Sequence, residues 1–221
     1  MPFFDLFPHL TQGLWVTLKV YVVSSLAVLV LSTLAGLGRV APNALLRGLA
    51  ALYVHVFRGL PVLILLFWLY YVLPYFGIEL GAFAVGVLGL GLNYSSYGAE
   101  IVRGAITSIP RGQWEAATAL NMSRWSRMRY VILPQALVRM LPPYGNLQIE
   151  LLKNTALVMF ISVEELAHHG RVLQNSTQRT AEIFGISLAF YFAIAALTAF
   201  VVRRIEVAAS RGIRAGGAHV A

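Results

Sequence analysis

Long apolar runs constrain the fold of this chain more than any other feature of its sequence. The cleanest run covers residues 183–202 and holds no charged side chain. About 20 apolar residues in a helix suffice to cross the hydrocarbon core of a bilayer. The whole chain is 58% apolar and only 12% charged, with a mean hydropathy of +0.73. These values exclude a water-soluble domain and predict an all-α, polytopic membrane protein.

Five apolar runs predict five transmembrane helices in a single membrane domain, residues 1–210. They start near residues 14, 49, 82, 144 and 183. The second run is too long for one straight crossing and contains Arg58-Gly59-Leu60-Pro61. Because proline removes a backbone donor, we expect the helix to break there. No apolar pattern follows the fifth run, and we expect a disordered cytoplasmic tail over residues 211–221.

Charge placement predicts the orientation of these helices. Arginines follow the first, third and fifth spans, at Arg39, Arg47, Arg103, Arg111, Arg124, Arg127, Arg129, Arg203, Arg204, Arg211 and Arg214. The acids Glu79, Glu164, Glu165 and Glu182 fall on the other side. Basic loops stay in the cytoplasm, so the N-terminus is expected outside and the C-terminus inside. Lipid headgroups, which we expect Arg124 and Arg127 to contact, then account for the net charge of +8 without a nucleic-acid partner.

A polar, basic interval separates the third and fourth apolar runs. Its alanine-rich part, residues 114–120, predicts a short helix that contains Glu115-Ala116-Ala117. Asn121 stands where this helix would end, and asparagine tolerates the left-handed conformation that often terminates helices. Ser123 can cap a second, amphipathic and basic helix. The interval is therefore predicted to be a docking element on the cytoplasmic side.

Charged side chains inside the predicted spans have two alternative explanations. Glu100 in the third span and Glu150 and Lys153 in the fourth are costly in hydrocarbon unless they are paired or face the protein interior. Glu150 and Lys153 stand three positions apart, close enough to form an ion pair on one helix face. The first alternative is such a structural pair.

The second alternative is a substrate site for an amino acid. Glu100 would meet an ammonium or guanidinium group, while Asn154 and Thr155 would meet a carboxylate where the fourth span changes direction. Arg58 fits either a pathway role or a structural role at the broken helix. His168 and His169, adjacent in an outer loop, are expected to be solvated rather than to bind a metal.

Several of these segments resemble the inner-membrane permease subunits of ATP-binding cassette (ABC) importers, in the branch for polar amino acids such as histidine, glutamine and arginine. The loop of that family has Glu-Ala-Ala, three residues, a glycine, a spacer and Ile-x-Leu-Pro or a close variant. This chain has Glu115-Ala116-Ala117, then Asn121 in place of the glycine, and Ile132-Leu133-Pro134. Further matching segments are Arg58-Gly59-Leu60-Pro61, residues 96–104, residues 133–136 and Lys153-Asn154-Thr155-Ala156-Leu157. Leu60 and Ala156 replace the usual threonine and serine.

The resemblance implies a type I ABC importer permease fold, with a coupling loop over about residues 104–134. In that family two permeases, identical or sister chains, frame a translocation path in the bacterial inner membrane. Two ATPase subunits dock below, an extracytoplasmic solute-binding protein delivers the substrate, and rigid-body alternating access moves it inward. The residues that the resemblance assigns to ATPase coupling are Glu115, Ala116, Ala117, Leu120 and Asn121.

The chain itself is predicted to be a non-catalytic subunit. It has no glycine-rich loop ending in Gly-Lys-Ser or Gly-Lys-Thr, so a partner would use the ATP, and we expect no cofactor or metal here. Two other classes stay open. A secondary transporter driven by an ion gradient usually has inverted repeats, and none is visible in this sequence. A non-transporting membrane scaffold leaves the charges within the spans unexplained.

Overall fold

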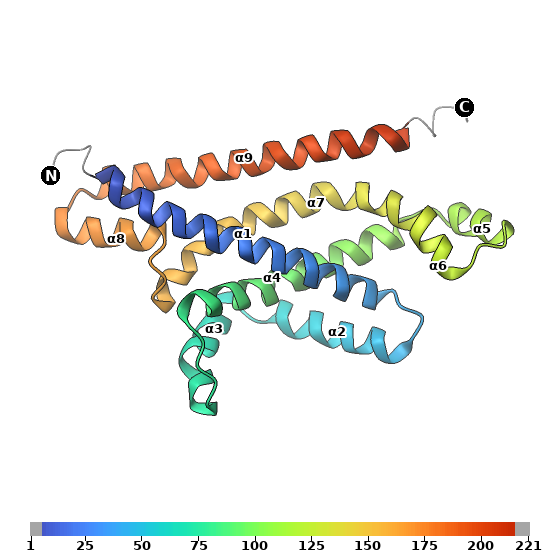
Figure 1. The fold of residues 1–221 in the computed structure, drawn as a ribbon, viewed down its shortest axis with the longest axis horizontal. Coiled ribbons are helices and arrows are strands. Elements are labelled where there is room, and N and C mark those ends of the chain that lie inside the picture. The colour runs from blue at the N-terminus through green and yellow to red at the C-terminus, as the bar shows by residue number, and fades with distance from the viewer. Residues whose placement is uncertain (1–5, 215–221) are drawn as a thin grey trace.

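The computed structural model describes residues 6–214, and every element within that range is a helix, as predicted. Figure 1 shows the long helices running along the molecule: α1 (Leu6–Arg39), α4 (Ala82–Thr107), α7 (Leu133–Asn154) and α9 (Thr180–Arg214). Of the remaining helices, α2 (Ala44–Gly59) packs against α1 and α4. These helices form the bundle that carries the candidate site.

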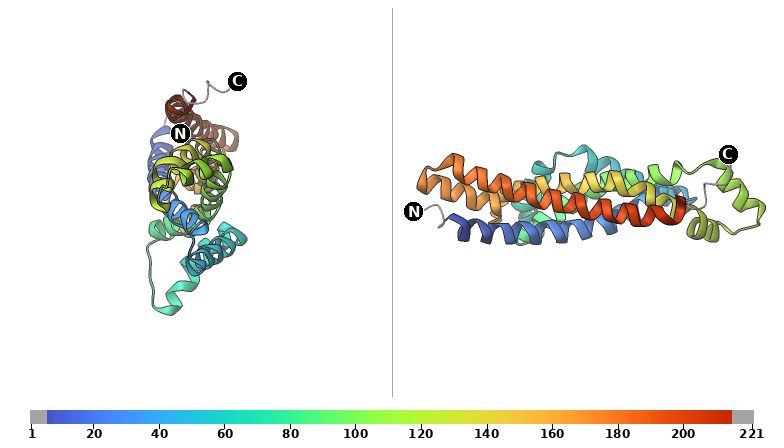
Figure 2. Two further views of the ribbon diagram at one scale, coloured as in Figure 1. Left: turned by 90° about the vertical axis from the view of Figure 1, so that its right-hand side faces the viewer. Right: turned by 90° about the horizontal axis from the view of Figure 1, so that it is seen from above.

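Shorter helices lie at the two ends and at one side of this bundle. At one end lie α5 (Arg111–Ala119), α6 (Arg124–Arg127) and the π-helical turn η4 (Met128–Ile132) (Figure 1 and Figure 2). At the other end lies α8 (Leu166–Thr177), joined to α7 by the 3-10 helix η5 (Thr155–Ile161). Projecting to one side are α3 (Val62–Phe67), the π-helical turn η2 (Trp68–Val72) and the 3-10 helix η3 (Leu73–Phe76).

The predicted break in the second apolar run is confirmed. α2 ends at Gly59, and the helical segment that follows Pro61 leaves it at an angle of 99°. The buried amide of Asn93 on α4 fills the break, because it donates hydrogen bonds to the carbonyl oxygens of Phe57 (2.8 Å) and Leu60 (3.0 Å). Carbonyl groups freed by the broken helix are thereby satisfied inside an apolar protein.

The fourth apolar run forms a longer helix than the sequence predicts. The span start near Tyr144 stays a prediction, but the helix itself begins at Leu133 and carries Pro142 and Pro143 inside it. Proline in a helix interior removes one backbone hydrogen bond, which is why it suggests a boundary. Ala136, fully buried, packs in a hydrophobic cluster with residues of α4. This tertiary packing outweighs the local effect of the prolines.

Two segments predicted as loop or tail are helical. α8 occupies the predicted outer loop after residue 163. α9 continues to Arg214, so residues 211–214 of the predicted disordered tail belong to a helix. Residues 215–221, the rest of that predicted tail, lie outside the described residues.

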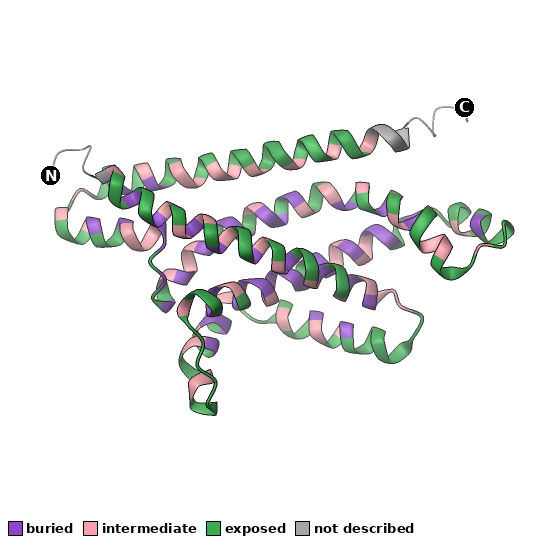
Figure 3. Cartoon of the chain, in the orientation of Figure 1, coloured by how far each residue is buried: buried purple, intermediate pink, exposed green. Residues whose placement is uncertain are grey.

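Length and composition identify two candidate membrane spans within residues 6–214, at residues 7–39 and 180–210. The bent pair of residues 44–59 and 62–76 makes a third if it counts as one span. Length and composition do not identify α4 and α7 as spans, so the total of five spans stays a prediction. Figure 3 shows that α9 is exposed along most of its length, with apolar side chains such as Phe192 (72% exposed) on the surface. Lipid or another chain must cover this helix.

α1 and α4 approach each other closely where small residues face one another. A β-carbon on Gly36 would lie 2.5 Å from the Cβ of Val102, and one on Gly98 would lie 2.6 Å from the Cβ of Ser32. Both distances are too short for any larger side chain without movement of the helices. Small residues permit this kind of close helix packing in membranes. The packing sets the position of the end of α1 beside the middle of α4.

Candidate functional site

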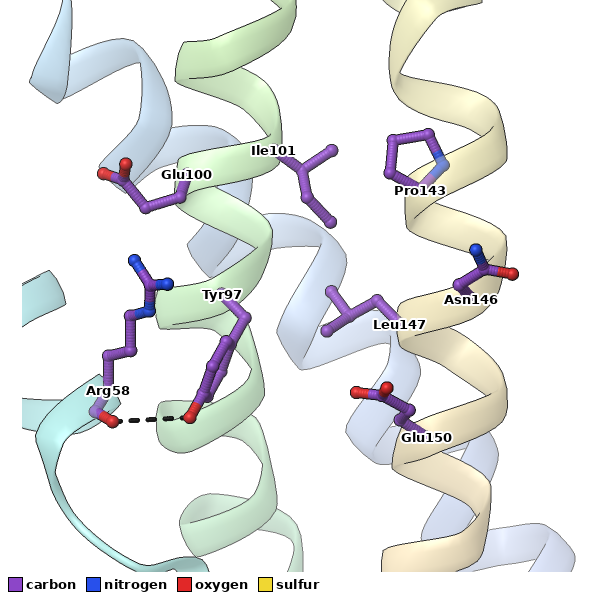
Figure 4. Close-up of a pocket in the computed structure, with 8 residues that line it drawn as sticks. All are labelled: Arg58, Tyr97, Glu100, Ile101, Pro143, Asn146, Leu147 and Glu150. Carbon is purple, nitrogen blue, oxygen red and sulfur yellow. Dashed lines mark hydrogen bonds between the residues drawn. The ribbon is translucent and has the colours of Figure 1, made fainter.

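A polar cavity of about 370 Å³ lies between α2, α4 and α7 (Figure 4). It is lined by Arg58 from α2, by Tyr97, Glu100 and Ile101 from α4, and by Pro143, Asn146, Leu147 and Glu150 from α7. The predicted pathway residues Arg58, Glu100 and Glu150 meet here, although they come from three different helices. Charged groups are costly in a membrane protein, so their convergence marks this cavity as the candidate site.

The carboxylate of Glu100 is held by two guanidinium groups. Arg39, at the end of α1, donates from Nε to Oε1 over 3.1 Å. Arg103, one turn further along α4, lies 2.9 Å from Oε2. The side chains of Glu100 and Arg39 are only 20% and 19% exposed. Glu100 therefore joins α1 to α4 at the border of the cavity, and both of its oxygens are already engaged.

Arg58 places a positive charge at the cavity. Its Cζ lies 5.5 Å from the centroid of the Tyr97 ring, and the Tyr97 hydroxyl donates a 3.4 Å hydrogen bond to the carbonyl oxygen of Arg58. Figure 4 shows the guanidinium pointing along α4 toward Glu100. Within residues 6–214 no carboxylate forms an ion pair with Arg58. The guanidinium is thus available to an anionic group that enters the cavity.

Glu150 faces the cavity from α7, opposite the side lined by Arg58 and Tyr97 (Figure 4). It is exposed, and it forms no ion pair with any described residue. The predicted Glu150–Lys153 ion pair is therefore wrong. Both side chains are exposed, and two flexible side chains on an accessible surface gain little free energy from pairing.

The polar groups of Asn154 and Thr155 serve the end of α7 and do not line the cavity. Thr155 is fully buried, and its hydroxyl donates to the carbonyl oxygen of Leu152 over 2.7 Å. The amide of Asn154 donates to the carbonyl oxygen of Glu150 over 3.0 Å. Lys153 likewise lies outside the cavity lining. Of the predicted pathway residues, the structure thus brings together only Arg58, Glu100 and Glu150.

α5 presents an exposed face at one end of the molecule. Glu115, Ala116 and Leu120 are exposed, and Leu120 has 77% of its surface free. Ala117 is only 2% exposed and packs inward. A short helix that is followed by an exposed leucine and carries small residues beside it suits a groove on a partner protein.

The predicted helix ends of this loop are confirmed. Asn121 has a φ of 54°, the left-handed conformation expected of it. The next N–H, of Met122, donates to the carbonyl oxygen of Ala117 over 3.1 Å, as in a Schellman motif. Ser123 caps α6, because its hydroxyl oxygen accepts a 3.2 Å hydrogen bond from the N–H of Ser126. These local bonds define the shape of the loop.

A second carboxylate site, at the opposite end of the molecule, is not predicted by the sequence. Glu165 is fully buried at the start of α8, where Oε1 accepts a hydrogen bond from the N–H of His168 (2.9 Å). Oε2 accepts from the hydroxyls of Tyr191 (2.7 Å) and Thr17 (3.3 Å). Thr17 lies 148 positions away, so no local pattern marks the contact. His168 and the adjacent His169 are half-buried, on a helix that packs against α1, and the prediction that they are solvated stays a prediction.

Comparison with known proteins identifies the family. Residues 28–214 match the family described as the inner membrane component of binding-protein-dependent transport systems. The chain belongs to this family. Membership favours a permease over the ion-gradient transporter and the scaffold that the sequence left open.

Individual permeases are similar over nearly their whole length. The probable amino-acid ABC transporter permease protein y4tF of Sinorhizobium fredii is 38% identical, over 96% of this chain and 91% of that protein. The glutamine transport system permease protein GlnP of Escherichia coli is 37% identical, over 90% of this chain and 92% of that protein. In the crystal structure of an amino acid ABC transporter with histidines, one chain matches with a TM-score of 0.85 and 33% identity, over 91% of this chain and 94% of that chain. These matches establish a type I ABC permease fold.

Proposed function

We propose that this chain is the permease subunit of an ATP-driven importer in the bacterial inner membrane, and that its substrate is a polar or charged amino acid. The observation that carries the proposal is the charged cavity between α2, α4 and α7 in a chain of a binding-protein-dependent transport family. Relatives named as amino-acid and glutamine permeases support the substrate class.

The cavity offers groups of opposite charge to the two ends of an amino acid. Arg58, unpaired within residues 6–214, would bind the substrate carboxylate through its planar guanidinium. Glu150, on the other side, would bind the ammonium group. Glu100 borders the cavity but is engaged by Arg39 and Arg103, so Glu150 is the better cation site. The volume of about 370 Å³ suits a small molecule.

A second permease, either a copy of this chain or a sister chain, would cover the open side of the cavity. Asn146, Glu150 and Lys153 are exposed on α7. A helix in the hydrocarbon core presents such side chains to lipid only at a high cost in free energy. Two permeases paired across this face would enclose these groups in a path shielded from lipid. Asn154 and Thr155 would support that path by ending α7 at a defined point.

An ATPase subunit would dock on the exposed face of α5, formed by Glu115, Ala116 and Leu120. That partner would bind and hydrolyse the ATP, so this chain would need no cofactor. α5 and the C-terminus would then lie in the cytoplasm and the N-terminus outside, as the arginine distribution predicts. A solute-binding protein would deliver the substrate at the outer end, near α8. ATP-driven movement of α5 would bias the permease pair between outward- and inward-open states.

Transport in reconstituted vesicles tests this function. The permease is inserted with its ATPase subunit into vesicles that contain ATP, the solute-binding protein is added outside, and uptake of radiolabelled glutamine, arginine and histidine is measured. We expect uptake to require ATP hydrolysis, and Glu115→Arg, which reverses a charge on the docking face, to abolish it. Uptake that ignores ATP and follows an ion gradient would replace the importer by a secondary transporter. Failure to recover an ATPase subunit with the permease, together with an active Glu115→Arg variant, would also contradict the proposal.

A further inference from the structure

Side chains outside its exposed docking face attach α5 to the rest of the fold. We propose that Arg127 on α6 is a positioning residue that fixes α5 relative to α7, so that movement of α5 is passed to the substrate cavity. This inference rests on the proposed coupling function and adds to it the contact that keeps the two helices together.

The guanidinium of Arg127 contacts two successive turns of α5. Its Nη1 donates a 2.8 Å hydrogen bond to the hydroxyl oxygen of Thr118, and its Cζ lies 5.5 Å from the centroid of the Trp114 ring. Thr118 in turn donates to the carbonyl oxygen of Trp114 over 2.8 Å. A ring contact and a hydrogen bond from one planar group restrain both the distance and the rotation of α5.

Arg127 is half-buried, and its guanidinium faces α5, while the predicted contact with lipid headgroups stays a prediction. Its Nε is buried, and none of the described residues supplies an acceptor for it. On the inner side of α5, Trp114 packs against a buried cluster that includes Ile109 and Ile132. α5 is therefore held between a guanidinium group and a hydrophobic cluster.

α6 continues into the helix that lines the cavity. α6, η4 and α7 follow one another without a gap over residues 124–154, with right-handed helical backbone angles at both junctions. Glu150 lies on this continuous segment. A second bond attaches α5 to the start of α7, because the Gln135 amide donates to the side-chain oxygen of Gln113 over 3.2 Å. A displacement of α5 is thus transmitted along one helical path to the cavity.

Neighbouring arginines show that charge alone does not explain this contact. Arg124 is exposed, and Arg129 is exposed over the ring of Tyr130, its neighbour in the chain. Neither has a described contact with α5. A general need for positive charge in the loop would involve all three arginines, whereas a positioning role involves only Arg127. Arg124 is therefore a matched control.

Paired spin labels test the positioning directly. The chain contains no cysteine, so Gly112→Cys in α5 and Leu137→Cys in α7 create two unique labelling sites. A β-carbon at position 112 meets nothing within 4 Å, and Leu137 is 53% exposed. The complete importer in lipid nanodiscs is measured by pulsed electron paramagnetic resonance, with and without Arg127→Met or Arg124→Met. Uptake and ATP hydrolysis are measured on the same unlabelled variants.

We expect Arg127→Met to widen the distribution of α5–α7 distances about twofold and to lower uptake per ATP hydrolysed about tenfold. Arg127→Lys, which keeps the charge but loses the planar group, should lie between Arg127→Met and the unmodified chain. Arg124→Met should match the unmodified chain in both measurements. Thr118→Val replaces the hydroxyl with a methyl group, so it removes the hydrogen bond from Arg127 and tests that contact if Arg127→Met does not assemble.

Two results overturn the positioning role. One is an unchanged distribution of α5–α7 distances in Arg127→Met and Thr118→Val. The other is a loss of uptake per ATP hydrolysed in Arg124→Met that equals the loss in Arg127→Met. Failure of the proposed function gives a different result, because uptake by the unmodified importer would then not depend on ATP. In that case the label distances still report whether Arg127 positions α5.

Discussion

Glu165 and Glu150 are two carboxylates in the same apolar protein, yet their surroundings are opposite. Glu165 is fully buried and accepts hydrogen bonds from Tyr191, Thr17 and the N–H of His168. Glu150 is exposed on a cavity and forms no ion pair within residues 6–214. A buried carboxylate is tolerated when its lone pairs are filled, which makes Glu165 a structural group. A carboxylate left open on a helix of this kind retains its capacity for another partner.

Glu100 lies between these two extremes. Its carboxylate is mostly buried and paired with Arg39 and Arg103, but it also borders the cavity. The comparison therefore predicts a graded series of effects on the free energy of unfolding, with Glu165 at one end and Glu150 at the other. For the effect of substitution on transport the order is reversed, and the larger loss is expected at Glu150.

The largest loss of stability is expected for Glu165→Ala. The change leaves the Tyr191 hydroxyl and the N–H of His168 without their acceptor in a buried site, while the Thr17 hydroxyl keeps the carbonyl oxygen of Gly13, and the cost is about 3 kcal/mol. Thermal and denaturant unfolding in detergent, followed by circular dichroism, measures the loss. Glu164→Ala, at the exposed neighbouring position, is the control and should change stability by less than about 0.5 kcal/mol. Equal stability of the two variants would remove the distinction between buried and open carboxylates.

A smaller loss, about 1 kcal/mol, is expected for Arg39→Met. It removes one of the two partners of Glu100 and the polar link between α1 and α4 at a partly buried site. A double-mutant cycle with Glu100→Gln isolates the energy of this pair. A coupling energy of zero would show that the close packing of α1 and α4 alone holds these helices together.

Glu150→Gln should leave stability within about 0.5 kcal/mol of the unmodified protein and reduce amino-acid uptake about tenfold or more. The carboxylate supports no described contact in the fold, but it is the proposed partner of the substrate ammonium group. Unfolding and vesicle uptake are measured on the same preparation. Glu79→Gln, an exposed acid away from the cavity, is the matched control. Normal uptake by Glu150→Gln would end the proposed role of this residue.

The smallest effect is expected for Lys153→Met. Its ammonium pairs with no described carboxylate, so stability should change by less than about 0.5 kcal/mol and uptake by less than about twofold. A marked loss of stability that disappears in the Glu150→Gln background would be evidence for the Glu150–Lys153 ion pair, which the structure does not show.

Features that depend on neighbours in the chain could be predicted from the sequence. Asn121 and Ser123 terminate and cap their helices through bonds to residues at most five positions away, and both were foreseeable from residue type alone. The break at Pro61 follows from the missing backbone donor in the same way. The apolar runs likewise predict an all-helical membrane protein because their length matches the bilayer.

Features that depend on packing between distant segments could not be predicted in this way. Arg39 belongs to an arginine pattern that indicates orientation, yet its partner Glu100 is 61 positions away. Glu165 depends on contacts with α1 and α9, and no local pattern separates it from exposed Glu164. The convergence of Arg58 and Glu150 on one cavity requires the arrangement of three helices, which periodicity does not supply.

The hydrogen bonding of Glu165 also links segments that the ribosome delivers at different times. α1 and α8 precede α9 in the chain, and α9 carries Tyr191, the donor of the shortest hydrogen bond to this carboxylate. Before α9 is made, only Thr17 and the N–H of His168 can reach the carboxylate. This end of the bundle can therefore close around Glu165 only after residue 191 has been added, which places the closure late in synthesis.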